Sequence, residues 1–128
     1  MKPYLHAKNS VKKFGGQINN YLEIHNWFDQ TKAHVADMRH RLFLHNSFGC
    51  FLAEQVFGTY IINSEGGKVQ VRDIAEQHIL EDMGRIPSLQ DCLEKVPFHS
   101  WLGVKKTVPK RFNLETGEFI NEEEENVD

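Results

Sequence analysis

The sequence predicts a mainly α-helical domain with one β-hairpin, an α+β fold arranged as a compact bundle around a central hydrophobic helix. Three observations support this prediction. Glycines follow several apolar segments of helical spacing, two β-branched runs flank a Gly-Gly turn, and 40% of the 128 residues are hydrophobic. A chain of this length and composition can bury one core without disulfides.

The first two helices are predicted to be short. The segment 5–14 has apolar residues at helical spacing and is followed by Gly15-Gly16, and glycine readily adopts the left-handed backbone that ends helices. A second helix is predicted from about Tyr21 to Phe28, where only a few positions are polar.

The third predicted helix, over residues 31–57, is the longest. Thr31 is a suitable N-cap and Gly58 a suitable stop. Its second part is apolar on nearly every face, which predicts the central position in the bundle. Gly49, within that part, indicates a close helix crossing or a bend.

Turn signals divide the remainder of the domain. The runs 59–63 and 68–72 flank a glycine turn and predict a β-hairpin. A helix is then predicted over residues 73–83, ended by Gly84. Ser88 begins a further helix with a capping box.

The domain prediction is a single globular domain over residues 1–103, followed by a flexible tail over 104–128. The tail is first basic and then acidic. Five acidic residues at its end set the overall net charge of −3. Without a basic surplus, the composition does not favour a nucleic-acid partner.

The start of the chain, residues 1–14, carries charges throughout and lacks the apolar core of a secretory signal. No apolar run approaches the length needed to span a bilayer. Cys50 and Cys92 lie in apolar stretches, where a free thiol behaves as a small hydrophobe. We therefore expect a cytoplasmic protein with reduced thiols and no membrane partner.

Seven histidines suggest metal binding, because neutral imidazole is the commonest metal ligand. On one continuous helix His34 and His45 would lie about 16 Å apart, too far to share an ion. His78 has carboxylates three and four positions later on the same helical face. The resulting prediction is a zinc-like divalent site with four candidate ligands: His40, His45, His78 and Asp82.

The alternative is a structural network of ion pairs and hydrogen bonds that needs no cofactor. Arginines and carboxylates match in number and sign, and a central helix must satisfy its buried donors. We favour this interpretation over metal binding, since no HExxH or CxxC motif is present. Its candidate polar cluster consists of Arg39, Arg41, His45, Glu76 and His78.

No catalytic residue is assigned from the sequence, and an enzyme is not favoured. Cys50 lies in an apolar run, where burial raises the pKa of a thiol and makes it less reactive. The serines are not within a nucleophile elbow, and the Gly-Gly pairs lack the spacing of a phosphate-binding loop.

Several motifs lie along the domain: His6-Ala-Lys-Asn-Ser-Val-Lys-Lys-Phe-Gly-Gly16, Tyr21-Leu-x-Ile-His25-x-Trp-Phe-Asp29, Asp37-x-Arg-His-Arg41 with His45, Phe57-Gly58, and Glu76-Gln-His78-x-x-Glu-Asp82-x-Gly-Arg-Ile-Pro87. Together, over about residues 4–103, they resemble a small uncharacterised domain family of bacteria and their phages. The resemblance implies a histidine pattern of His6, His25, His40, His45 and His78, and it implies no activity.

Two function hypotheses follow. The first is a small intracellular accessory protein, phage-encoded by the resemblance, that binds a partner protein of unknown identity; self-association is left open. The second is a small metal-dependent hydrolase or metal-binding domain that uses a histidine and carboxylate cluster. A third idea is that the clustered histidines sense pH, because histidine titrates near neutrality.

Overall fold

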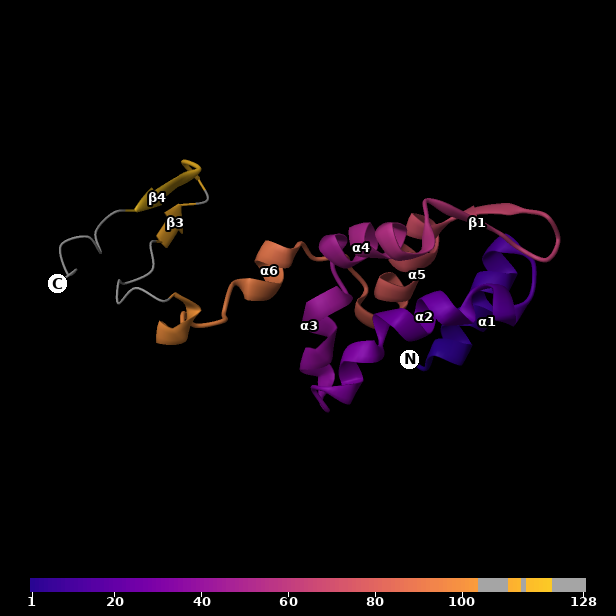
Figure 1. Cartoon of the computed structure of the whole chain (residues 1–128), viewed down its shortest axis with the longest axis horizontal. Coiled ribbons are helices and arrows are strands. Elements are labelled where there is room, and N and C mark those ends of the chain that lie inside the picture. The colour runs from indigo at the N-terminus through magenta and orange to yellow at the C-terminus, as the bar shows by residue number, and fades with distance from the viewer. Residues whose placement is uncertain (104–110, 114, 121–128) are drawn as a thin grey trace. The chain divides into compact units, whose positions relative to one another are not determined.

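The computed structural model describes residues 1–103, 111–113 and 115–120 (Figure 1). The chain forms two compact units, Met1–Glu94 and Lys95–Asp128. The predicted domain end at residue 103 stays a prediction. Within the described residues, no helix has both the length and the apolar character needed to cross a membrane.

The first unit is mainly helical and contains one antiparallel hairpin, which confirms the predicted fold class. Its α-helices are α1 (Pro3–Phe14), α2 (Leu22–Phe28), α3 (Arg41–Leu44), α4 (Ser47–Phe57), α5 (Val71–Met83) and α6 (Leu89–Leu93). The 3₁₀ turns are η1 (Ile18–Asn20), η2 (Gln30–Ala33) and η3 (Met38–His40). The strands are β1 (Tyr60–Ile62) and β2 (Lys68–Gln70).

The helix at the centre of this unit is α5. It contacts α1, α2, α4 and both strands, and it buries both apolar and polar side chains. The prediction that residues 31–57 supply the central helix is wrong, because α4 leaves Phe48, Phe51 and Val56 exposed. An apolar composition on every face did not identify the buried helix.

The predicted helix over residues 31–57 is also divided into η2, η3, α3 and α4. His45 has φ −81° and ψ 61°, which is not helical, and the Asn46 side chain accepts the backbone N–H of Gly49 at 2.8 Å. Asn46 thus caps a new helix. A side chain at Gly49 would collide with the carbonyl of Leu44, so the expected bend lies here.

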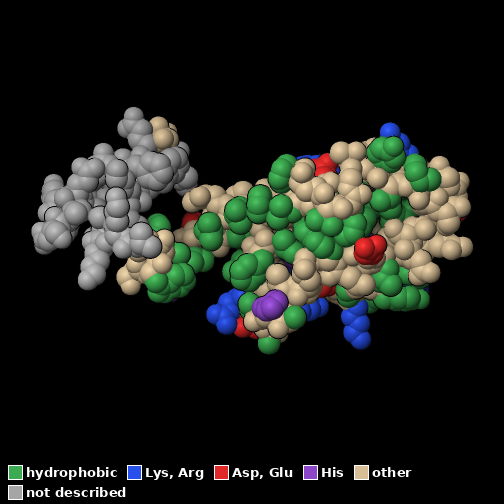
Figure 2. All heavy atoms as spheres, viewed as in Figure 1, with side chains coloured by type: hydrophobic (Ala, Val, Ile, Leu, Met, Phe, Trp, Pro, Cys, Tyr) green, Lys and Arg blue, Asp and Glu red, His purple; other side chains and the backbone are tan. Residues whose placement is uncertain are grey.

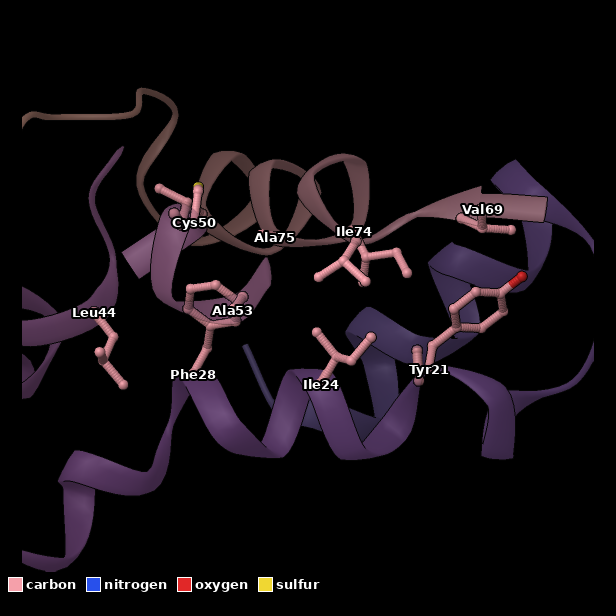
Figure 3. Packing of buried hydrophobic residues seen from close by; sticks show 12 residues of the cluster. Tyr21, Ile24, Phe28, Leu44, Cys50, Ala53, Val69, Ile74 and Ala75 are labelled. Carbon is pink, nitrogen blue, oxygen red and sulfur yellow. The ribbon is translucent and has the colours of Figure 1, made fainter. Parts of the chain in front are cut away.

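Apolar side chains from α2, α4, α5 and the hairpin form the core. Figure 3 shows Ile24 and Phe28 directed from α2 toward α5, and Tyr21, which precedes α2, directed toward Val69 of β2. Ile74 and Ile79 of α5 are fully buried. This apolar half of the interior holds α2 against α5 and thereby positions the polar groups described below.

The hairpin and the helix ends agree with the sequence. Tyr60 pairs with Gln70 and Ile62 with Lys68, as predicted for the turn around Gly66. Gly84 ends α5 in the left-handed region with φ 75°. Ser88 forms the predicted capping box at the start of α6.

The second unit contains η4 (Ser100–Leu102) and an antiparallel hairpin of β3 (Arg111–Asn113) and β4 (Glu118–Ile120). This hairpin falls inside the segment 104–128, which the sequence predicts to be a flexible tail. The turn with Gly117 at φ 72° was not recognised as a hairpin signal. The acidic end, residues 121–128, lies outside the described residues.

Candidate metal centre

A polar cluster occupies the interior where α1, α2, α5 and the α3–α4 junction meet. Four histidines in it are fully buried, and two aspartates have side chains no more than 7% exposed. The members are His6, His25, His45, His78, Asp29 and Asp82. Charged groups at this depth require partners, because an unpaired buried charge costs several kcal/mol.

Four ligand atoms of this cluster converge on one point, and we call them the 29/45/78/82 group. Nε2 of His78 lies 3.1 Å from Nε2 of His45 and 3.3 Å from one oxygen each of Asp29 and Asp82. Nε2 of His45 lies 2.9 Å from Asp82 and 3.5 Å from Asp29. These atoms all lie within 4.8 Å of one another.

Local structure places each of these groups. His78 and Asp82 are four residues apart on α5, so they share one face of the helix. Asp29 is the residue that ends α2. His45 occupies the non-helical junction between α3 and α4, and there its side chain is fully buried.

A second histidine group lies behind the first and shares His78 with it. His6, His25 and His78 also bring ring nitrogens within 4.8 Å of one another. The rings of His6 and His78 are stacked with centroids 3.9 Å apart. Nδ1 of His25 lies 2.9 Å from Nδ1 of His78.

Both aspartates are held in the ionised form. Burial alone would raise the pKa of Asp82, but hydrogen bonds from His45, His6 and His78 outweigh it and hold that pKa far below its usual range. Burial likewise opposes ionisation of Asp29, and the hydrogen bond from His78 lowers its pKa. The two carboxylates therefore carry negative charge in the interior, next to the imidazole nitrogens of the cluster.

The histidines differ in their protonation. Burial, followed by repulsion from His78 and His6, lowers the pKa of His25 to about 2, so this ring is neutral. Burial also lowers the pKa of His45, against the hydrogen bond to Asp82. For His78, hydrogen bonds to Asp29 and Asp82 outweigh burial and raise the pKa. The two carboxylates thus favour a proton on Nε2 of His78.

Cationic groups surround the two carboxylates. The amino group of Met1 lies 2.8 Å from Asp82, and the guanidinium of Arg41 lies 3.8 Å from the same side chain. Lys32 lies 3.7 Å from Asp29. Several buried atoms of the described residues still lack a hydrogen-bond partner: Asp29 Oδ2, His40 Nε2, Arg41 Nε and His45 Nδ1.

The structure brings together three of the four predicted metal ligands: His45, His78 and Asp82. The fourth, His40, is buried beside His45 with ring centroids 6.0 Å apart, and it is not in the group. Its Nδ1 instead lies 2.8 Å from the carbonyl oxygen of Asp37.

The predicted polar cluster is only partly assembled. Arg41, His45 and His78 lie in or beside the site. Arg39 lies on the surface, with a side chain 78% exposed, and forms an ion pair with Asp37. Glu76 is also turned outward, where it lies 3.9 Å from Arg72.

Sequence reasoning missed Asp29 as a ligand, and it named His6 and His25 without a role. A signal was present, since His25 and Asp29 have the same i, i+4 spacing as His78 and Asp82. Two such pairs on two buried helices predict two His/Asp faces.

The fold and the cluster define a small α+β domain with a buried histidine and aspartate site. The chain belongs to the DUF6915 family, described as a domain of unknown function, which matches residues 1–102. The resemblance to an uncharacterised family is thereby confirmed, while its bacterial and phage origin stays a prediction. Neither the curated proteins nor the solved structures contain a match to the chain.

Proposed function

We propose that this chain is a metal-binding domain that holds one zinc-like divalent ion between Asp29, His45, His78 and Asp82. The observation that carries the proposal is the spacing of the ligand atoms. Five of their mutual distances lie between 2.9 and 3.5 Å. Tetrahedral zinc with bonds of about 2.0–2.1 Å to nitrogen and oxygen separates its ligand atoms by about 3.3 Å.

The ligand types support the same class of ion. Two imidazole nitrogens and two carboxylate oxygens suit zinc and similar first-row metals better than calcium, which prefers six to eight oxygens. Ionised Asp29 and Asp82 supply two negative charges, which a divalent cation neutralises. Binding displaces the proton from His78, so it depends on pH.

The test is metal analysis of the purified full chain, followed by titration with zinc. We expect about one equivalent of zinc and a rise in melting temperature, because a ligand that binds only the folded state stabilises it. Asp82→Asn should abolish both effects. Asp73→Asn, an exposed position on the same helix, is the matched control. Less than about a tenth of an equivalent, with no thermal shift from zinc, manganese or nickel, overturns the proposal.

Metal-dependent hydrolysis is a second candidate, suggested by Arg41. Its guanidinium lies beside Asp82, and its buried Nε lacks a hydrogen-bond partner among the described residues, so it is suited to bind an anionic substrate. Four protein ligands fill a zinc tetrahedron, whereas catalytic zinc keeps one position for water. The test is turnover of an activated phosphodiester by the zinc-loaded chain. Turnover that is lower in Arg41→Gln supports hydrolysis, and absence of turnover rejects it.

An accessory role through protein binding is supported by a different region. Hydrophobic side chains gather over α4 (Figure 2), and Phe43, Phe48 and Phe51 are 42–54% exposed. Exposed apolar groups in such numbers are typical of association surfaces. A second copy of the chain is the first occupant to test. A concentration-dependent dimer lost in Phe51→Glu supports this role, and a monomer at all concentrations rejects self-association.

A further inference from the structure

We infer that a one-directional hydrogen-bond chain through Gln77, Ser10 and His25 fixes the tautomer of His78, so that its Nε2 lone pair faces the metal position. The inference rests on the proposed function and deepens it, because it assigns positioning residues behind the ligands. It also gives the second histidine group a role other than a second metal site.

The donor-to-acceptor direction of this hydrogen-bond chain is set at Gln77, because two acceptors fix the orientation of its amide group. Its Nε2 lies 2.9 Å from the carbonyl oxygen of His6 and 3.1 Å from Oε1 of Glu81. Neither oxygen can donate, so the NH₂ group of Gln77 must face them. The Oε1 atom of Gln77 is thereby directed at Ser10, at 2.7 Å.

Ser10 has a single hydroxyl hydrogen, which it donates to Oε1 of Gln77. The hydroxyl also lies 3.1 Å from the carbonyl oxygen of His6, but this oxygen is an acceptor too. With either acceptor, the hydrogen points away from the ring of His25. The Ser10 oxygen therefore accepts from Nε2 of His25, which lies 2.8 Å away.

His25 is a neutral ring and carries one hydrogen, which Ser10 places on Nε2. The ring is completely buried, and its two hydrogen-bond partners, the Ser10 hydroxyl and the His78 ring, carry no negative charge that could pair with a protonated ring. Its Nδ1 is therefore a bare lone pair. Nδ1 of His78, 2.9 Å away, must donate to it.

The last step fixes His78. When its hydrogen is on Nδ1, the neutral ring presents a lone pair at Nε2, and this atom lies within 3.3 Å of Asp29, His45 and Asp82. A metal-ligating histidine needs this tautomer, and a hydrogen bond from its other nitrogen usually sets it. His25 and Ser10 are thus positioning residues.

The hydrogen-bond chain also indicates which of the two histidine groups binds the ion. In the group of His6, His25 and His78, the Nδ1 atoms of His25 and His78 are joined by a hydrogen bond. Nδ1 of His6 lies 2.7 Å from Glu81 and its Nε2 lies 3.1 Å from Asp82. The shared hydrogen leaves neither Nδ1 atom free to bind an ion, and the group has no carboxylate ligand, so we expect one ion in the 29/45/78/82 group and none in this group.

The first test is the tautomer of His25, measured by long-range ¹H–¹⁵N correlation on the full chain with ¹⁵N-labelled histidine. We expect the Nε2–H form without metal and after addition of zinc. An Nδ1–H form overturns the inference. The metal-free spectrum tests the tautomer of His25 even if the wild-type chain binds no zinc. Absence of zinc binding would reject only the proposed function.

The second test compares His25→Asn with His25→Leu, two side chains of nearly the same shape. Asparagine can place an acceptor oxygen near the former Nδ1 position, whereas leucine has none. Loss of a hydrogen-bond partner behind a ligand typically weakens metal binding 10–100-fold. We expect that loss of zinc affinity in His25→Leu and a loss of about threefold or less in His25→Asn.

Equal zinc affinity in the two folded variants overturns the inference while the proposed metal site stands. Circular dichroism verifies that both variants are folded. If His25→Leu does not fold, Ser10→Ala replaces it. This variant removes the anchor at Nε2, and the His25 ring is expected to populate both tautomers in the ¹⁵N spectrum. An unchanged single tautomer in Ser10→Ala contradicts the role of Ser10.

Discussion

The interior of the first unit has an apolar half and a polar half, and α5 contributes to both. Ile74 and His78 lie one turn apart on this helix, and both are fully buried. The apolar half is stabilised by area removed from water, about 1.5–3 kcal/mol for a side chain such as Ile74. The polar half is stable only while every charge has a partner.

The comparison teaches that burial alone does not reveal what a residue contributes. Replacing a buried ion cluster by apolar groups is often neutral or stabilising. The convergence of Asp29, His45, His78 and Asp82 therefore supports the proposal that this cluster binds a ligand. The following predictions separate the two halves, from the largest effect to the smallest.

The largest effect is expected for Asp82→Ala. This change leaves His45 and His78 without the carboxylate that lies 2.9 and 3.3 Å away, and removal of one partner from a buried pair costs about 3–5 kcal/mol. Urea unfolding in the absence of metal measures the loss. Arg39→Ala, at an exposed ion pair, should leave the unfolding midpoint nearly unchanged. An equally small change in both variants would contradict the charge-dependent stability of the polar half.

Ile74→Ala tests the apolar half. Loss of this buried side chain should destabilise the chain by about 2–5 kcal/mol, because it removes apolar contacts and leaves a cavity. The zinc-induced rise in melting temperature should remain, since Ile74 is not a ligand. Loss of zinc binding in a folded Ile74→Ala variant would show that the two halves are not separable.

Acidification should weaken the fold through His25. Its pKa is about 2 in the folded chain and about 6.5 when unfolded, so below about pH 6.5 only the unfolded state takes up this proton. Its contribution is complete above that pH and falls by about 1.4 kcal/mol per pH unit below it. The lowered pKa of His45 acts in the same direction, and the raised pKa of His78 acts in the opposite one.

Urea unfolding of wild type and His25→Asn between about pH 7 and 5 isolates this contribution. The wild type should lose more stability than the variant over this range. Identical pH profiles would show that His25 takes up its proton in the folded state as well.

The smallest effect concerns Cys50, whose thiol lies in the apolar half and is 1% exposed. Burial raises its pKa to about 11, so almost none of it is thiolate at neutral pH. Iodoacetamide should modify Cys92 in the folded chain and leave Cys50 intact, as mass spectrometry of peptides can show. Modification of both cysteines at one rate would contradict the packing of this half.

The fold could be predicted largely from local signals. Gly15, Gly84 and the Ser88 capping box mark helix ends through backbone conformation and capping, which depend on a few neighbouring residues. The break at His45 could not be predicted in the same way. Asn46 is polar within an apolar run, and whether it caps a helix or lies inside one depends on tertiary packing.

The site could be predicted only in part. The pair of His78 and Asp82 follows from helical spacing, and His45 is a candidate because a histidine of the long predicted helix could complete the ligand set. Asp29 and His25 were not assigned, because their contacts with His78 bridge 49 and 53 residues of sequence. Helix spacing carries no information about which two faces meet.

The sequence separation within the polar cluster has a kinetic consequence. His78 meets His25 across 53 residues and His45 across 33, and Asp82 meets His6 across 76. The atoms of the 29/45/78/82 group come together only after the end of α2, the α3–α4 junction and α5 have docked. If the proposed ion binds there, we expect it to slow global unfolding and to protect the slowest-exchanging amide hydrogens of these three segments together.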